Sequence, residues 1–251
     1  MEHAPVIFLD TNVFHYLRLY LGLAEDLRLR PVGKSPKDTG LAIKKKCKGR
    51  ARADFIKGRD TLNYLCRRCK DGARVVYAPI TCLELMYGLL RGRAIVSLAK
   101  EGAPQRMWSR VDEDEILARL LPADYAVAQD AAGKCEATCA ALGLPMVKAD
   151  PESMRDVWAL AENIVGHVFM QVEDSVVFAS ALLESADELL TGDHYLRKIA
   201  SYIGNPGGAP YGQRTYYGHL KKQIARLVAD TTGERPLHVA FPKLPARGAI
   251  K

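Results

Sequence analysis

The sequence lacks several features that would assign it to a familiar class. It has no apolar run approaching the roughly eighteen residues that cross a membrane. Its start has no basic region before the first apolar run, residues 6–9, so no signal peptide is expected. Gly-x-Gly-x-x-Gly, Walker and Gly-x-Ser-x-Gly motifs are absent, which removes support for dinucleotide, ATP and serine-hydrolase functions. With no export signal, the 6 cysteines are expected to be reduced thiols in a cytoplasmic protein without membrane contact.

The composition is that of a soluble globular protein. Apolar residues make up 48% of the 251 residues and charged residues 26%. The formal net charge is +7, but residues 28–59 hold twelve Lys or Arg against two acids, so this segment alone carries +10 and the rest −3. A local basic block favours a polyanionic partner such as nucleic acid, with a solvated surface loop as the alternative.

Hydrophobic periodicity predicts strands that alternate with helices. This alternation favours an α/β fold with a mostly parallel sheet, in which helix outweighs strand. The expected strands are 6–9, 74–78 and 188–190. The expected helices are 11–23, 51–70, 81–98, 113–142 with a break at Pro122, 153–165, 173–185, 194–202 and 213–229. The Gly- and Pro-rich run 204–210 is the best candidate linker, and an extended segment is expected at 237–241.

Four acids occupy equivalent places in this pattern. Asp10, Glu84 and Asp193 each follow an expected strand, and Asp174 begins an expected helix. The carboxyl ends of parallel strands meet at one edge of a sheet, so we expect the four side chains to be neighbours there. Clustered carboxylates need a counter-cation to stay ionised together, and an all-oxygen donor set suits Mg²⁺ or Mn²⁺.

Each acid also has a structural explanation. Asp10 and Asp193 are each placed to N-cap the helix that follows. Thr81 and Glu84 have the spacing of a capping box. Asp174 is placed to be stabilised by the dipole of its own helix.

Three segments of the sequence resemble the signature blocks of the PIN domain, the fold of VapC-type toxin ribonucleases and related nucleases. The blocks are 8–14, 78–89 and 173–182, and the last continues to 189–193. The resemblance implies a helix-rich, three-layer fold around a mostly parallel sheet. It further implies that Asp10, Glu84, Asp174 and Asp193 are both the catalytic residues and the ligands of Mg²⁺ or Mn²⁺, and that the reaction is hydrolysis of RNA phosphodiester bonds. Substrate-side polar support would come from Thr11, Asn12 and Thr191.

The chain is longer than compact PIN domains. We therefore expect a PIN-like domain over 1–203, with a basic insertion at about 28–59 and a helical insertion at about 91–150, followed by a linker and tail over 204–251. Lys44, Lys45 and Lys46 in the basic insertion are candidates to bind RNA. By the same resemblance, a small antitoxin protein and a second copy of the chain are expected as candidate partners.

Competing interpretations stay open at this point. The main one is a PIN-like module that binds RNA or a protein without cutting. A haloacid-dehalogenase-type phosphatase needs a second Asp at position 12, where this chain has Asn12. DNA cleavage by a flap-nuclease relative would generally use more acids than four. The two cysteine pairs, Cys66-x-x-Cys69 and Cys135-x-x-x-Cys139, have zinc-like spacing, but their helical patterns favour buried thiols.

Overall fold

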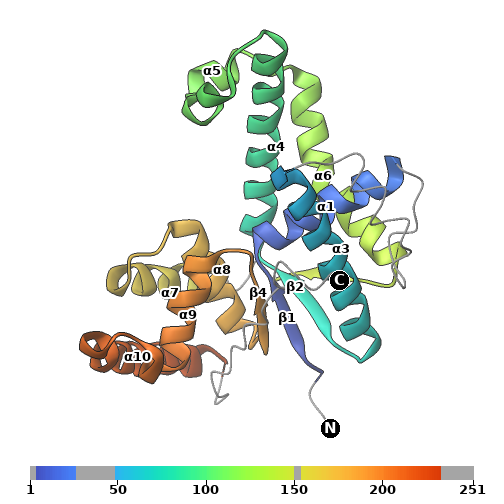
Figure 1. Cartoon of the computed structure of the whole chain (residues 1–251). Helices are drawn as coiled ribbons and strands as arrows, with labels where there is room; N and C mark the ends of the chain where they lie inside the picture. Colours follow the sequence, from blue (N-terminus) through green and yellow to red (C-terminus); the bar gives the residue numbers. More distant parts are fainter. Residues whose placement is uncertain (1–3, 27–48, 150–153, 233–251) are drawn as a thin grey trace.

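The protein is built on a four-stranded parallel sheet (Figure 1). A computed structural model of the whole chain describes residues 4–26, 49–149 and 154–232. The strands are β1 (Val6–Leu9), β2 (Arg74–Tyr77), β3 (Met146–Lys148) and β4 (Glu188–Leu190), in the spatial order β3-β2-β1-β4. In register, Ile7 of β1 lies opposite both Val75 and Glu188. The first strand of the chain is therefore a central strand of the sheet.

Helices account for most of the described chain, as expected. Their bounds are α1 (Thr11–Asp26), α3 (Gly49–Lys70), α4 (Pro79–Lys100), α5 (Glu113–Leu117), α6 (Pro122–Ala141), α7 (Met154–His167), α8 (Val172–Leu183), α9 (His194–Gly204) and α10 (Arg214–Thr232). None of these helices is both long and apolar enough to cross a membrane, within the residues described.

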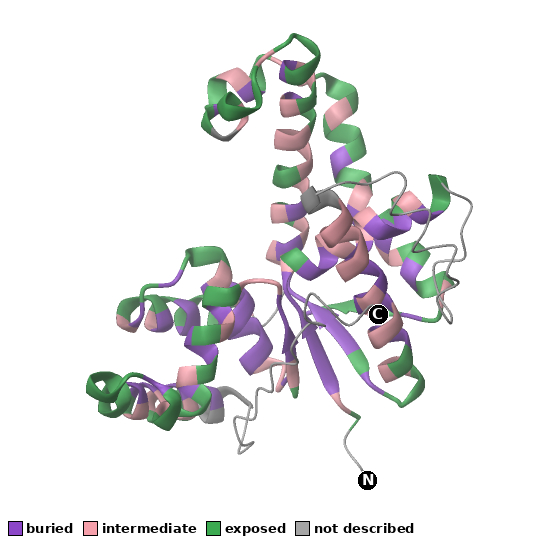
Figure 2. Cartoon of the chain, viewed as in Figure 1, coloured by how far each residue is buried: buried purple, intermediate pink, exposed green. Residues whose placement is uncertain are grey.

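The sheet is covered on both faces, which gives three layers. Successive residues of β1 point to opposite sides, as strand geometry requires. Val6 and Phe8 pack into a core formed with α7, α8, α9 and α10. Ile7 and Leu9 pack into a second core with α1, α3 and α6. All four residues of β1 are buried, which explains why the strand reads as a continuous apolar run (Figure 2).

One sheet strand lies inside the segment that was expected to be a helical insertion. β3 pairs in parallel with β2, so that segment contributes to the sheet as well as to helices. The strand has only three residues, and Val147 in its middle is 46% exposed. A short, half-exposed edge strand has no long apolar run or clean alternation, so the sequence pattern did not reveal it.

The predicted capping box at the start of α4 is wrong. The N-cap is Ala78, no side chain caps the helix, and Pro79 occupies its first turn. Proline suits that place because the amide it lacks would have no partner there anyway. Thr81 is thus inside the helix and buried, while Leu83 two residues later is 64% exposed.

The chain beyond α9 packs against the body. A 3-10 turn, Pro206–Gly208, joins α9 to α10 within the run expected to be a linker, and Ala209 beside it is buried. Tyr217 and Ile224 of α10 belong to the core shared with α7, α8 and α9. The expected tail helix is confirmed, and the division of the chain at residue 204 stays a prediction. The extended segment predicted at 237–241 lies outside the described residues.

Candidate functional site

The four predicted acids lie at the carboxyl edge of the sheet. Asp10 follows β1 directly, and its amide donates to the Leu190 carbonyl at the end of β4, 3.1 Å away. Asp193 follows β4 at the start of α9. Glu84 lies in the second turn of α4, just after β2, and Asp174 in the first turn of α8. Four segments distant in the sequence thus deliver carboxylates to the region where β1, β2 and β4 end.

Asp10 is the buried centre of this group. Its side chain is only 2% exposed. One of its oxygens, Oδ2, accepts from Thr191 Oγ1 at 2.6 Å and from Asn12 Nδ2 at 3.1 Å. Burial raises the pKa of Asp10, whereas these hydrogen bonds favour the carboxylate and lower it. Thr191 and Asn12, both predicted as polar support, are therefore in direct contact with the central acid.

Glu84 is held from the other side by the start of α1. Thr11 Oγ1 donates to Glu84 Oε2 and lies 3.5 Å from Thr81 Oγ1. Burial raises the pKa of Glu84, the bond from Thr11 lowers it, and the charges of Asp10 and Glu173 raise it. Thr11 therefore orients the carboxylate of Glu84. Asp10, the residue before Thr11 in the chain, carries another carboxylate of the group.

Asp193 lies at the carboxyl edge of the sheet and also caps a helix. Its Oδ1 accepts from the Leu196 amide at 2.7 Å, so it is the N-cap of α9, as one interpretation predicted. Its own amide donates to Thr191 Oγ1 at 2.9 Å. The Thr191 hydroxyl therefore links the backbone of Asp193 to the carboxylate of Asp10.

The ionisation of Asp174 shows how closely the acids interact. Burial raises its pKa to about 7, and the charges of Asp10, Asp193, Glu84 and Glu173 contribute to the rise. All four predicted acids therefore share one electrostatic environment. Glu173, a fifth acid beside Asp174 in the first turn of α8, was not predicted as a site residue. Its adjacency to Asp174 in the sequence was the available signal.

The four acids lie near one another, but they are not arranged as a metal-binding site. Among the described residues, no group of three or more His, Cys, Asp or Glu side chains is arranged to hold a metal ion. The oxygen-only donor set and the mutual repulsion suit a hard divalent cation in their chemistry. Thr11, Thr191 and the Leu196 amide each donate to one oxygen of a carboxylate, so these bonds fix the present directions of Glu84, Asp10 and Asp193.

The structure describes the predicted cysteine pairs but not the predicted lysine triplet. Lys44, Lys45 and Lys46 lie outside the described residues. Cys66, Cys135 and Cys139 are free and buried within the core on the α1 side of the sheet. Burial raises the pKa of the Cys66 thiol to about 11. The expectation of buried thiols is confirmed for these three residues.

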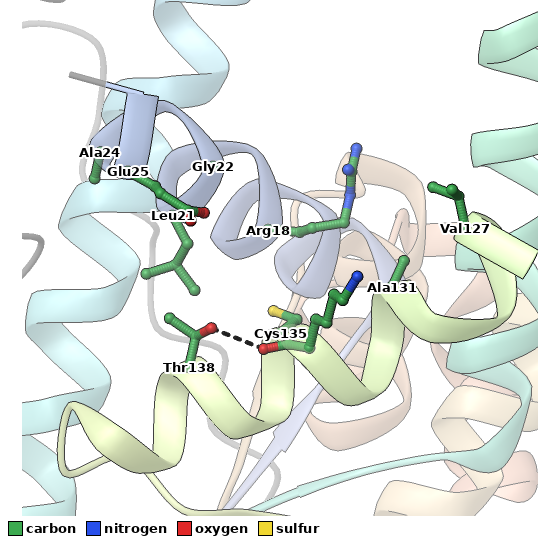
Figure 3. A pocket seen from close by; sticks show the side chains of 10 residues that line it. Arg18, Leu21, Gly22, Ala24, Glu25, Val127, Ala131, Cys135 and Thr138 are labelled. Carbon is green, nitrogen blue, oxygen red and sulfur yellow. Dashed lines mark hydrogen bonds between the residues drawn. The ribbon is translucent and has the colours of Figure 1, made fainter. Parts of the chain in front are cut away.

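A cavity of about 440 Å³ lies between α1 and α6 (Figure 3). It does not include the acidic edge, by which we mean Asp10, Glu84, Asp174 and Asp193 at the ends of the strands. Arg18 and Glu25 line it from α1, and Lys134 and Cys135 from α6. Lys134 is already paired with Asp130 at 2.6 Å. None of the predicted site residues lines this cavity, so it is not part of the candidate site.

Comparison with known protein families, with curated proteins and with solved structures finds no match to this chain. The assignment of function therefore depends on the acidic edge and on the chemistry that its residues support.

Proposed function

We propose that this protein is a metal-dependent endoribonuclease of the PIN-domain type, which hydrolyses RNA phosphodiester bonds at its acidic edge. The observation that supports the proposal is the gathering of Asp10, Glu84, Asp174 and Asp193 at the carboxyl ends of parallel strands. Burial, together with the charges of the neighbouring acids, raises the pKa of Asp174 to about 7. A fold that keeps several repelling carboxylates together gains most when a cation binds between them.

The residues of the acidic edge would have different roles in hydrolysis. Asp10 and Asp174 would be the main ligands of Mg²⁺ or Mn²⁺, and Glu84 or Asp193 would accept the proton of the attacking water. When bound, the ion would neutralise the scissile phosphate and lower the pKa of water. Thr191 and Asn12 orient Asp10.

The same proposal extends to the surroundings of the site. RNA is the proposed substrate, and Lys44, Lys45 and Lys46 are proposed to bind its phosphates. A small antitoxin protein and a second copy of the chain are the proposed protein partners, and the cytoplasm is the proposed location. These assignments all depend on the resemblance to PIN domains.

A PIN-like module that binds RNA or protein without cutting is the second candidate. One observation favours it: Asp10, Glu84 and Asp193 accept hydrogen bonds from Thr191, Thr11 and a backbone amide, and no three acids among the described residues are arranged to hold a metal ion. The two candidates differ in a single measurable property, which is cleavage in the presence of a divalent ion.

The deciding experiment is a cleavage assay on a mixed pool of structured and single-stranded RNA. Wild type is compared with Asp10→Asn in Mn²⁺, in Mg²⁺ and in EDTA. We expect cutting that requires the metal and falls by at least about a hundredfold in the variant, because the central ligand loses its charge. An amide can still accept the Thr191 bond, so the fold should persist, as circular dichroism would show.

Asp130→Asn is the matched control for this assay. Asp130 is an exposed acid on α6 whose partner is Lys134, away from the edge, so its loss should leave cleavage unchanged. Full activity in Asp10→Asn would refute the site assignment. RNA binding without any cutting by wild type would favour the non-catalytic module.

A further inference from the structure

The acidic edge needs a nearby cation if it is to accept a nucleic acid. Its carboxylates repel the phosphates of a polynucleotide, and proteins position such a backbone chiefly with Lys and Arg. The Lys triplet at 44–46 lies outside the described residues. Within them, Lys57 on α3 is held in contact with a residue of α1 that borders the edge.

Close packing between α3 and α1 fixes the place of Lys57 (Figure 1). A Cβ atom on Gly58 would lie 2.6 Å from Tyr20 Cβ and would also collide with the Tyr16 carbonyl. The backbone of α3 therefore touches that of α1, which only glycine permits at position 58. Its neighbour Lys57 lies against Tyr16 as a result, with Nζ 3.2 Å from the Tyr16 hydroxyl and 4.7 Å from the centre of its ring.

Tyr16 in turn lies against the loop that carries Asp193. A Cβ atom on Gly192 would be 3.0 Å from Tyr16 Cε2 and 3.2 Å from Tyr16 Oη. Gly192 separates Thr191, which donates to Asp10, from Asp193. The Tyr16 hydroxyl thus lies between the ammonium of Lys57 and the backbone of the acidic edge.

The charge of Lys57 is accessible to a ligand. Its side chain is 36% exposed, and its ion pair with Asp54 has a long distance of 3.7 Å. A pair of this kind contributes little in water, so a phosphate can replace it. Tyr16 accepts the hydrogen bond from Lys57, and a phenol that accepts one bond retains its own O–H for donation.

We propose that Lys57, positioned by Tyr16, is a phosphate-binding residue for single-stranded RNA at the rim of the acidic edge. The inference rests on the proposed function and adds to it a subsite beside the reacting phosphate. Lys57 binds the backbone of a flanking nucleotide, and Tyr16 keeps the ammonium beside Gly192 and supplies a second donor.

The test measures RNA binding in EDTA, where no cleavage occurs. A fluorescein-labelled oligouridine is titrated with protein by fluorescence anisotropy at several salt concentrations between about 50 and 200 mM. We expect Lys57→Met to weaken binding and to reduce the slope of log affinity against log salt by about 0.7, the value of one lost contact to a single strand. Lys57→Arg should restore the slope, and Tyr16→Phe should give a smaller loss of affinity.

Lys198→Met is the matched control, because Lys198 also lies over a tyrosine ring, that of Tyr202, at 5.9 Å. Tyr202 packs against Tyr217 of α10, so this pair belongs to the α9–α10 side of the molecule. Its loss should leave the slope unchanged. An unchanged slope in Lys57→Met, or no binding of oligouridine by wild type, would overturn the proposed subsite. Either result is distinct from failure of the nuclease proposal, which the Asp10→Asn cleavage assay decides.

Discussion

Asp174 loses its proton at a higher pH than an ordinary aspartic acid does. Burial and four neighbouring carboxylates raise its pKa from the usual 3.8 to about 7. In the unfolded chain these causes vanish, so Asp174 ionises there near pH 4. The folded state therefore binds more protons than the unfolded state between these two values.

The expected consequence is a metal-free protein that loses stability as the pH rises. Stability from the raised pKa of Asp174 is fully present below about pH 4 and is lost as the pH rises through about 7. Asp174→Asn should flatten this dependence, because the amide does not titrate. Urea unfolding in EDTA from pH 5 to about 8 measures it. Identical slopes of unfolding free energy against pH in wild type and variant would contradict the raised pKa of Asp174.

Among the secondary-structure elements, the contact between α1 and α3 depends on one glycine. A side chain at position 58 would meet the backbone of Tyr16 and the Cβ of Tyr20. Both helices carry part of the core on that side of the sheet, including Leu17 and Leu62. Separating them would loosen that core as well as displace Lys57.

We expect Gly58→Ala to lower the free energy of unfolding by about 1–3 kcal/mol, the usual cost of overpacking. Gly133→Ala on α6 is the control, since nothing lies within 4 Å of its added methyl group. Alanine is the better helix former, so this change should raise stability by about 0.5–1 kcal/mol. The two variants should thus shift the urea midpoint in opposite directions. A stabilising Gly58→Ala would show that the two helices are not in contact there.

Elements with strong local signals could be predicted from the sequence, and those set by packing could not. Strands β1 and β4 have the expected bounds. The first is a continuous apolar run that ends at Asp10, and the second ends in two buried leucines before the turn at Thr191 and Gly192. Parallel topology alone predicted that Asp10, Glu84 and Asp193 lie at one edge of the sheet, whereas Asp174 comes from the first turn of α8. The contact of Thr11 with Glu84 and that of Lys57 with Tyr16 join different helices. No local pattern encodes such contacts.

At the scale of the whole molecule, α10 is part of one of the two main cores. Ile224 is fully buried among residues that α7, α8 and α9 supply. We expect Ile224→Ala to cost about 2–5 kcal/mol in a single cooperative transition. Leu227→Ala on the same helix should cost much less, because Leu227 is 37% exposed. Two separate transitions in wild type, with only the weaker one moved by Ile224→Ala, would instead support a distinct tail domain.

The central place of β1 has a consequence for protein synthesis. β1 cannot pair along its second edge until β4, at Glu188–Leu190, has been synthesised. A chain emerges from the ribosome with its N-terminus first. Until residue 193 has emerged, Asp10 has neither the Thr191 hydroxyl nor Asp193 beside it. A nascent chain of this protein therefore carries an incomplete acidic edge, and under the proposed function it would be unable to cut RNA before Thr191 and Asp193 have emerged.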